Sequence, residues 1–87
     1  MTTKLIERLL NTFNQLPSHK RQPYGKVIVM VQEGDVRCAT EYARQWFDRC
    51  RVEFEVKGNQ FWAFDFGVAG CFLSILTGKT QQIALAN

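Results

Sequence analysis

The fold depends most on residues 51–66, RVEFEVKGNQFWAFDF, which hold five of the eleven aromatic residues of this chain. Apolar and charged residues alternate through 51–57, and this period of two is typical of a strand with one buried face. Gly58-Asn59 then suits a two-residue hairpin turn, because glycine adopts a positive φ at no steric cost. The pattern therefore predicts a β-hairpin whose second strand is 60–66.

The second predicted strand is apolar on both sides. In the expected register, Phe61 and Ala63 face the core, whereas Trp62, Phe64 and Phe66 lie on the opposite face. A strand of this kind is either covered twice or shows its rings to a partner. We therefore expect the three rings either to lie under a helix or to bind a protein partner.

Length and composition indicate one small folded domain, 1–87. The chain has 46% hydrophobic and 22% charged residues and a net charge of +3, which permits an acidic or nucleic-acid partner without requiring one. We expect a cytoplasmic protein with no membrane partner, because we find no apolar run near ~20 residues and no signal peptide at the start. The three cysteines include no CxxC pair, and free thiols are expected.

The first third of the chain divides into three parts. Residues 1–16 predict an amphipathic helix that Pro17 ends. Residues 17–25 form a basic loop. Residues 26–32, KVIVMVQ, predict a central strand because they form an apolar run rich in β-branched residues.

A second helix is expected after Asp35, which suits its N-cap. Apolar residues recur at spacings of three and four from Val36 to Cys50. The opposite side of this helix carries Arg37, Arg44 and Arg51 in one row, with Glu41 and Asp48 beside them. Such a row is either a solvated face or a charged docking surface.

Residues 67–78 predict a third helix with Gly78 at its C-terminus, and residues 81–87 a terminal edge strand. Without its first helix, the chain then reads βαββαβ. The expected fold class is α+β: a ferredoxin-like βαββαβ sheet domain over 26–87 with an additional N-terminal amphipathic helix.

Catalytic and cofactor motifs are not found in the sequence. The only histidine, His19, lies in the basic loop, and no cysteine has a histidine or aspartate at a recognised spacing. Glu53 and Glu55 are expected to pair with Arg51 and Lys57 rather than to act as an acid and base. We therefore predict a non-enzymatic protein with no cofactor and no metal site.

The sequence favours a protein-binding module, an adaptor or inhibitor, and its small size suits a phage or another mobile element. The predicted contact residues are the aromatic and charged surfaces named above: Trp62, Phe64, Phe66, Arg37, Arg44 and Arg51. A homodimer is compatible with this apolar excess.

The alternative is a nucleic-acid-binding protein that contacts phosphates through its basic loop and stacks bases on the hairpin aromatics. The stretch KGNQFWAFDF loosely resembles the aromatic signature of RNA-recognition motifs, although Asp65 and two extra residues depart from that pattern. The residues predicted for this alternative are His19, Lys20, Arg21, Tyr24 and Lys26.

Overall fold

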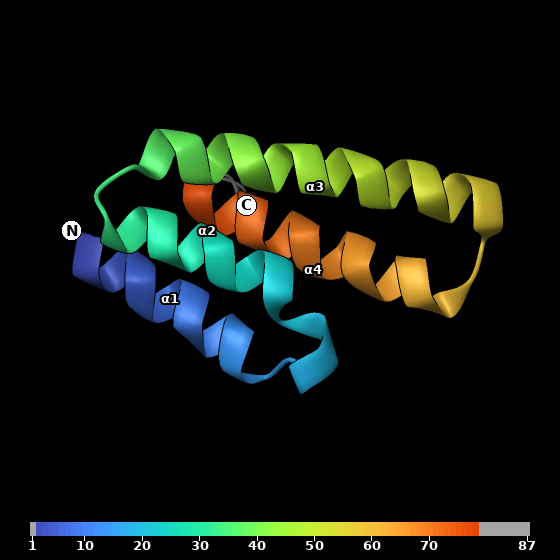
Figure 1. The fold of residues 1–87 in the computed structure, drawn as a ribbon, viewed down its shortest axis with the longest axis horizontal. Coiled ribbons are helices and arrows are strands. Elements are labelled where there is room, and N and C mark those ends of the chain that lie inside the picture. Colours follow the sequence, from blue (N-terminus) through green and yellow to red (C-terminus); the bar gives the residue numbers. More distant parts are fainter. Residues whose placement is uncertain (1, 79–87) are drawn as a thin grey trace, which may run out of the picture.

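The computed structural model describes residues 2–78, which form four α-helices and a single turn of 3-10 helix. Each helix runs antiparallel to the next, and α3 and α4 extend beyond the ends of α1 and α2 (Figure 1). Helix α1 packs on α2 and α4, and α3 packs on the same two helices, so the four surround one core. The bounds are α1 Thr2–Asn14, η1 Ser18–Lys20, α2 Gln22–Gln32, α3 Val36–Lys57 and α4 Gln60–Thr77.

The predicted ferredoxin-like βαββαβ sheet is wrong, because residues 2–78 contain no strand. The α+β assignment fails mainly at residues 51–66, where the end of α3 and the start of α4 replace the hairpin. Two ion pairs at i,i+4 spacing, Arg51–Glu55 and Glu53–Lys57, follow the helical period. The expected pairing of these four residues is thus confirmed, but along a helix.

The predicted strand 26–32 is also helical, as part of α2. The β-branched residues of 26–32 favour a strand locally. The buried residues of α2, however, are Tyr24, Val27, Ile28 and Val31. Their spacing of three, one and three places all four on one side of a helix. Burial of this side in the bundle outweighs the strand propensity, because most of the stability of a short helix comes from tertiary packing.

The other predicted helices are present, but two of them are longer than predicted: α3 continues past Cys50 to Lys57, and α4 begins at Gln60 rather than near residue 67. Helix α1 lies within the predicted 1–16, and α3 begins after Asp35, whose side chain accepts a hydrogen bond from the Cys38 backbone N–H at 3.0 Å. Helix α4 ends at Gly78, which has a φ of 74°. The predicted edge strand 81–87 lies outside the described residues.

Gly58-Asn59 is a turn as predicted, but it connects two helices. Gly58 has a φ of 63° and ends α3, while the Asn59 side chain accepts a hydrogen bond from the Trp62 backbone N–H at 3.1 Å. A glycine in the left-handed region followed by an asparagine N-cap lets the chain reverse in two residues. The same dipeptide therefore suits a helical hairpin as well as a β-hairpin.

The core contains side chains from all four helices. Leu9 and Leu16 from the N-terminal part pack with Tyr24 and Val31 of α2 and with Phe72 of α4. From α3 the core takes mainly small residues, Ala39 and Ala43. Small side chains allow α3 to approach its neighbours closely, which brings Trp46 over the N-terminal end of α2, where it contacts Tyr24.

Helix α4 is unusual in its composition. It contains one charged residue, Asp65, and by length and composition alone its 18 residues could cross a membrane, although 22% of them are buried in the bundle. The core helix of a water-soluble protein passes the same test, so this feature is weak evidence for a membrane. The expectation of no apolar run near ~20 residues followed from the division of 60–77 between a predicted strand and a predicted helix.

Candidate functional site

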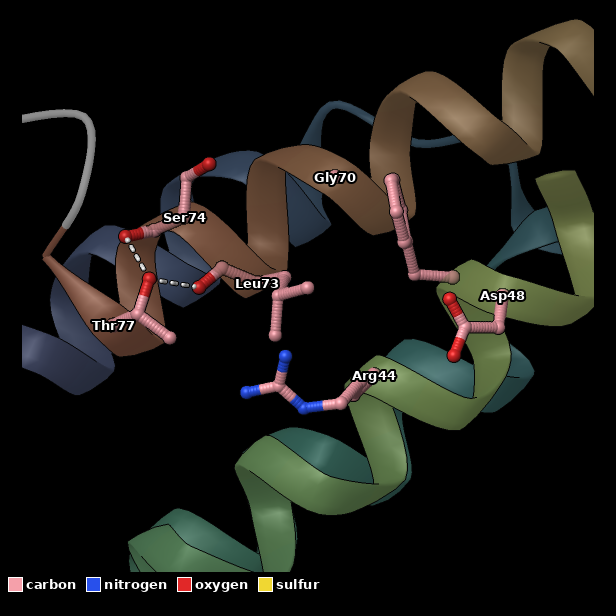
Figure 2. A pocket seen from close by; sticks show the side chains of 7 residues that line it. Arg44, Asp48, Gly70, Leu73, Ser74 and Thr77 are labelled. Atoms are coloured by element: carbon pink, nitrogen blue, oxygen red, sulfur yellow. Dashed lines mark hydrogen bonds between the residues drawn. The ribbon is translucent and has the colours of Figure 1, made fainter.

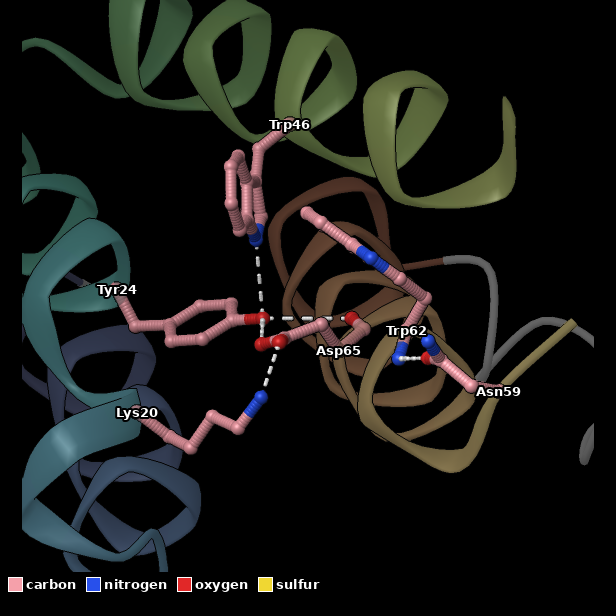
Figure 3. A network of polar contacts seen from close by, with 6 residues as sticks. All are labelled: Lys20, Tyr24, Trp46, Asn59, Trp62 and Asp65. Atoms are coloured by element: carbon pink, nitrogen blue, oxygen red, sulfur yellow. Dashed lines mark hydrogen bonds and ion pairs between the residues drawn. The ribbon is translucent and has the colours of Figure 1, made fainter. Parts of the chain in front are cut away.

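A buried polar network joins η1, α2, α3 and α4 where α4 passes the N-terminal end of α2 (Figure 3). The Lys20 ammonium donates to Oδ2 of Asp65 at 2.6 Å, and both side chains are more than nine-tenths buried. The Tyr24 hydroxyl donates to Oδ1 of Asp65 at 3.0 Å and accepts from the indole N–H of Trp46 at 3.0 Å. The Asp65 carboxylate thus bonds η1 and α2 directly and is connected to α3 through the Tyr24 hydroxyl.

The local sequence positions Lys20 for this contact. Pro17 follows α1 in an extended conformation and begins the single 3-10 turn in which Lys20 lies. Arg21 then fastens the turn to α1, since its guanidinium donates to the carbonyl oxygens of Leu16 at 2.9 Å and Asn14 at 3.2 Å. These carbonyls have no helical partner at the end of α1, so the arginine satisfies them.

Aromatic rings cover the ammonium group of Lys20. Its Nζ lies 3.1 Å from the centroid of the Phe61 ring and 5.6 Å from that of Phe64. A cation over an aromatic face is attracted by the ring, and more strongly where water is excluded. Phe61 thus seals the ion pair, although 54% of its own surface remains exposed.

The polar groups of the network are buried and hydrogen-bonded to one another. Burial raises the pKa of the Tyr24 hydroxyl far above its usual range, so the phenol stays protonated at neutral pH. Within residues 2–78, no buried side-chain nitrogen or oxygen lacks a hydrogen-bond partner. The same residues include no group of three or more histidine, cysteine, aspartate and glutamate side chains that could hold a metal ion. The network holds the Trp46 indole through the Tyr24 hydroxyl and places the Lys20 ammonium over the Phe61 ring.

A hollow of about 250 Å³ opens directly beside the network. We call it the aromatic hollow, because two indoles and a phenyl ring form much of its wall. The Trp46 and Trp62 rings are 6.4 Å apart between centroids, and Phe61 packs edge-on to Trp62 at 5.2 Å. Its lining residues are His19, Lys20, Gln22, Pro23, Trp46, Phe61, Trp62 and Asp65.

Two further hollows continue from the aromatic hollow along α2. The first, of about 230 Å³, shares Gln22, Pro23 and Trp46 with it, and the second, of about 510 Å³, shares Gln22 and Lys26 with the first. The second is mostly apolar and contains Val29, which is 50% exposed. The three hollows share lining residues in succession and follow one side of α2 from Phe61 toward Glu33, and we call this side of the molecule the furrow.

The rim of this furrow is mainly cationic. The Arg49 guanidinium lies 5.9 Å from the Trp46 ring, and the Lys57 ammonium 5.6 Å from the Trp62 ring, where it also pairs with Glu53 at 3.5 Å. Among the described residues, Glu33 is the one acidic residue at the far end of the furrow. Lys26 is exposed in the middle of the furrow, and His19 is exposed at the aromatic end. Asp65 adds no free negative charge, because Lys20 neutralises it. An apolar groove with this rim suits a ligand that is apolar and acidic.

Comparisons with protein-family models, curated proteins and solved structures found no match. No family is assigned. The function of the chain is therefore argued from the geometry of the furrow and of its neighbouring surfaces.

The predicted aromatic contact residues lie on different sides of α4, because a helix turns successive residues by 100° whereas a strand places alternate residues on one face. Trp62 lines the aromatic hollow and is half-buried. Phe64 is 43% exposed. Phe66 is half-buried between α3 and α4, with its ring 5.0 Å from Phe47 and 6.2 Å from Phe54. Of the three, only Trp62 contributes to the furrow.

The three arginines predicted as contact residues share one row of a helix, as expected from their spacing of seven. Arg37, Arg44 and Arg51 are all exposed along one row of α3, on a different side of the helix from Trp46. They are therefore remote from the aromatic hollow. Their row carries a second surface, which is treated below.

Of the five residues predicted for nucleic-acid binding, three are engaged inside the protein and two are exposed. Lys20 and Tyr24 are buried in the polar network, and Arg21 is bound to the end of α1. His19 and Lys26 remain exposed at the furrow.

Sequence reasoning missed Asp65, Trp46 and Phe61 as site residues. A signal for Asp65 was available, because it is the only charged residue between Gln60 and Thr77. A carboxylate within an apolar helix needs a cationic partner when it is buried. Lys20 of η1 is that partner, whereas the sequence placed it in a basic loop and predicted that it contacts phosphates.

Proposed function

We propose that this chain is a non-enzymatic protein-binding module, an adaptor or inhibitor, that receives a segment of a partner protein in the furrow along α2. The observation that carries the proposal is the aromatic hollow with its half-exposed Phe61. Rings from α3 and α4 surround a water-accessible space, and an internal network holds them in position. Rigid aromatic anchors of this kind supply much of the binding energy at protein interfaces.

The cationic rim indicates the chemistry of the partner segment. An apolar or aromatic side chain of the partner would enter the aromatic hollow, and acidic residues beside it would face Lys26, Arg49 and Lys57. The charges would guide the encounter and the register, whereas the buried ring would provide most of the affinity. The location expected from the sequence, the cytoplasm, is part of this proposal.

Titration with a labelled peptide tests the proposal. The probe is a short peptide with Trp and Leu anchors separated by Glu, and the control probe carries Lys in place of Glu. We expect micromolar binding of the acidic peptide, weakened roughly tenfold by Phe61→Ala or by Lys26→Glu. Val56→Ala removes a side chain that is 75% exposed on α3 and serves as the matched control.

The nucleic-acid alternative predicts a different result in the same assay. A labelled single-stranded oligonucleotide would then bind with a steep salt dependence while neither peptide binds. That outcome, or equal binding of the acidic and basic peptides, would contradict the protein-binding proposal.

A further inference from the structure

Helix α4 has a second side that its own bundle does not cover. Its inward side contributes Asp65, Ala69, Phe72 and Ile75 to the interior. On the opposite side the residues recur at spacings of 4-3-4-3, the repeat with which one helix packs along another. This outer row of α4 consists of Gln60, Phe64, Gly67, Cys71 and Ser74, and all but Ser74 are exposed.

The outer row carries no charge over about 21 Å of helix. Gly67 lies at its middle, and a Cβ built on this residue meets nothing within 4 Å. The other glycine inside α4 differs, because a Cβ at Gly70 would lie 3.2 Å from the Phe47 ring of α3. The packing of one chain thus accounts for Gly70, whereas no contact within residues 2–78 requires a glycine at position 67, where it weakens the helix.

A charged row on α3 runs beside this uncharged one. Arg44 and Asp48 form one wall of a hollow of about 370 Å³ whose other wall is Gly70, Ser74 and Thr77 of α4 (Figure 2). The charged row of α3 alternates in sign along its whole length, at spacings of 4-3-4-3-4, and every member is exposed. Its members are Arg37, Glu41, Arg44, Asp48, Arg51 and Glu55.

This alternation is complementary to itself in the antiparallel direction. From the N-terminal end of α3 the row begins with a positive charge, and from the C-terminal end it begins with a negative charge. Two antiparallel copies of the row therefore place opposite charges against each other. A second copy related by a two-fold axis therefore sets Arg44 against Asp48, Glu41 against Arg51 and Arg37 against Glu55. In the described part of the chain, neither Arg44 nor Asp48 forms an ion pair, so both are available for such contacts.

Along the direction of the helices, the middle of the outer row of α4 lies beside the middle of the charged row of α3. The Phe47 ring, near the middle of the charged row, packs between Phe66 and Gly70 of α4. The same two-fold axis then passes between Gly67 and Cys71, and it sets Gly67 of one copy against Cys71 of the other. The absent side chain of Gly67 would provide the space for that thiol.

We propose that the occupant of this face is a second copy of the chain, packed through the outer rows of α3 and α4 in an antiparallel two-fold dimer. Two helices about 10 Å wide and about 30 Å long offer on the order of 600 Å² per copy, below a standard interface. The dimer is therefore expected in the micromolar range. It leaves the furrow along α2 free, so the proposal does not depend on the proposed function.

Sedimentation equilibrium over a concentration series tests the dimer. We expect the mass to rise from one chain to two between about 1 and about 300 µM. Arg44→Glu should weaken dimerisation at least about tenfold, and adding Asp48→Arg should restore most of it, because the cross pairs then exchange signs. Glu7→Lys, at an exposed position of α1, is the matched control and should have no effect.

Gly67→Gln separates the interface from the fold. In a single chain the new side chain meets open space, so the melting temperature of the dilute protein should stay the same or rise. In the dimer it meets Cys71 of the second copy, and dimerisation should fall at least about tenfold. Labelling supports the same point: a thiol reagent should modify Cys71 more slowly as concentration rises, while Cys38 reacts at a constant rate.

Three results would overturn the dimer. The first is a monomer at every concentration, and the second is a dimer that neither Arg44→Glu nor Gly67→Gln weakens. The third is a monomer that co-sediments with phosphatidylcholine vesicles and loses this property in Gly67→Gln, which would assign the uncharged face to a lipid surface.

Discussion

Asp65 is a buried charged residue, and its burial requires a cation and hydrogen-bond donors beside the carboxylate. It lies 3% exposed in the most apolar helix, held by Lys20 and by the Tyr24 hydroxyl. A buried ion pair adds little net stability over an apolar pair of the same volume, but removal of one partner leaves an uncompensated charge. Its main consequence is that η1, α2, α3 and α4 meet in one arrangement.

Removing the cation tests this interpretation. Lys20→Met should lower the free energy of unfolding by about 3–5 kcal/mol, because the Asp65 carboxylate then stays buried without its counter-charge. The double variant Lys20→Met/Asp65→Leu should recover most of that loss. Urea unfolding followed by tryptophan fluorescence measures both.

The exposed pair of Lys57 and Glu53 provides the comparison. With the lysine side chain 51% exposed and an Nζ–O distance of 3.5 Å, Lys57→Met should cost less than about 1 kcal/mol. Equal losses in Lys20→Met and Lys57→Met would show that the buried pair has no special role.

Alkaline pH should destabilise the fold through two buried acids. Burial raises the pKa of the Cys50 thiol to about 12, and burial also raises the pKa of the Tyr24 hydroxyl. The unfolded chain releases these protons at lower pH than the folded chain. The stabilisation is therefore complete below the ordinary thiol pKa of about 8.5 and is lost as pH rises toward the folded values.

Urea midpoints at increasing pH should therefore fall above about pH 9. Cys50→Ala should reduce the slope in the first part of this range, although it lowers stability at neutral pH by opening a small cavity. A wild-type midpoint that stays constant from neutral pH to about pH 11 would contradict the burial of these two groups.

At the scale of the elements, α3 and α4 form the closest pair in the bundle, and Gly70 permits this approach. Phe47 lies against Gly70 and packs at a tilt on Phe66, so the α3–α4 contact depends on a missing side chain as well as on rings. Gly67, one turn earlier, faces away from α3 and plays no part in this contact.

The two glycines of α4 should therefore respond in opposite ways to alanine. In dilute protein, Gly67→Ala should stabilise the fold by about 1 kcal/mol, because alanine is the better helix former and the site is open. Gly70→Ala should gain nothing or lose stability, since its Cβ displaces the Phe47 ring. Thermal unfolding of the two variants measures the difference, and identical shifts would contradict the described packing.

The elements also show why part of the fold could be read from the sequence. Residues 36–50 have apolar residues at helical spacing and no competing pattern, so this helix was predicted correctly. Residues 51–57 support two periods at once, since Val52, Phe54 and Val56 alternate while Arg51–Glu55 and Glu53–Lys57 follow the helical spacing. Local alternation favoured the strand, and only the neighbours in the fold decided between the two.

At the scale of the molecule, the two proposed surfaces are separate. The furrow follows α2 and the near sides of α3 and α4, while the dimer rows occupy other sides of those two helices. Gly67→Gln should therefore leave the affinity for the acidic peptide unchanged within about twofold while it weakens dimerisation at least about tenfold. Fluorescence titration of dilute variant and wild type tests this, and a joint loss would show that the surfaces are coupled.

By itself, the sequence determined that a helix begins after Asp35, that the chain turns at Gly58-Asn59 and that a helix ends at Gly78. It also determined that 36–50 is helical and that Arg37, Arg44 and Arg51 share one row. Caps, positive φ and helical spacing are local properties, so neighbouring residues are enough to specify them. Only the tertiary structure decided that 26–32 and 51–66 are helical, that Lys20 is buried, and that Trp46, Phe61 and Trp62 surround one hollow. These features depend on contacts between residues as far apart as Lys20 and Asp65, and the free energy of burying such groups together outweighs local preference.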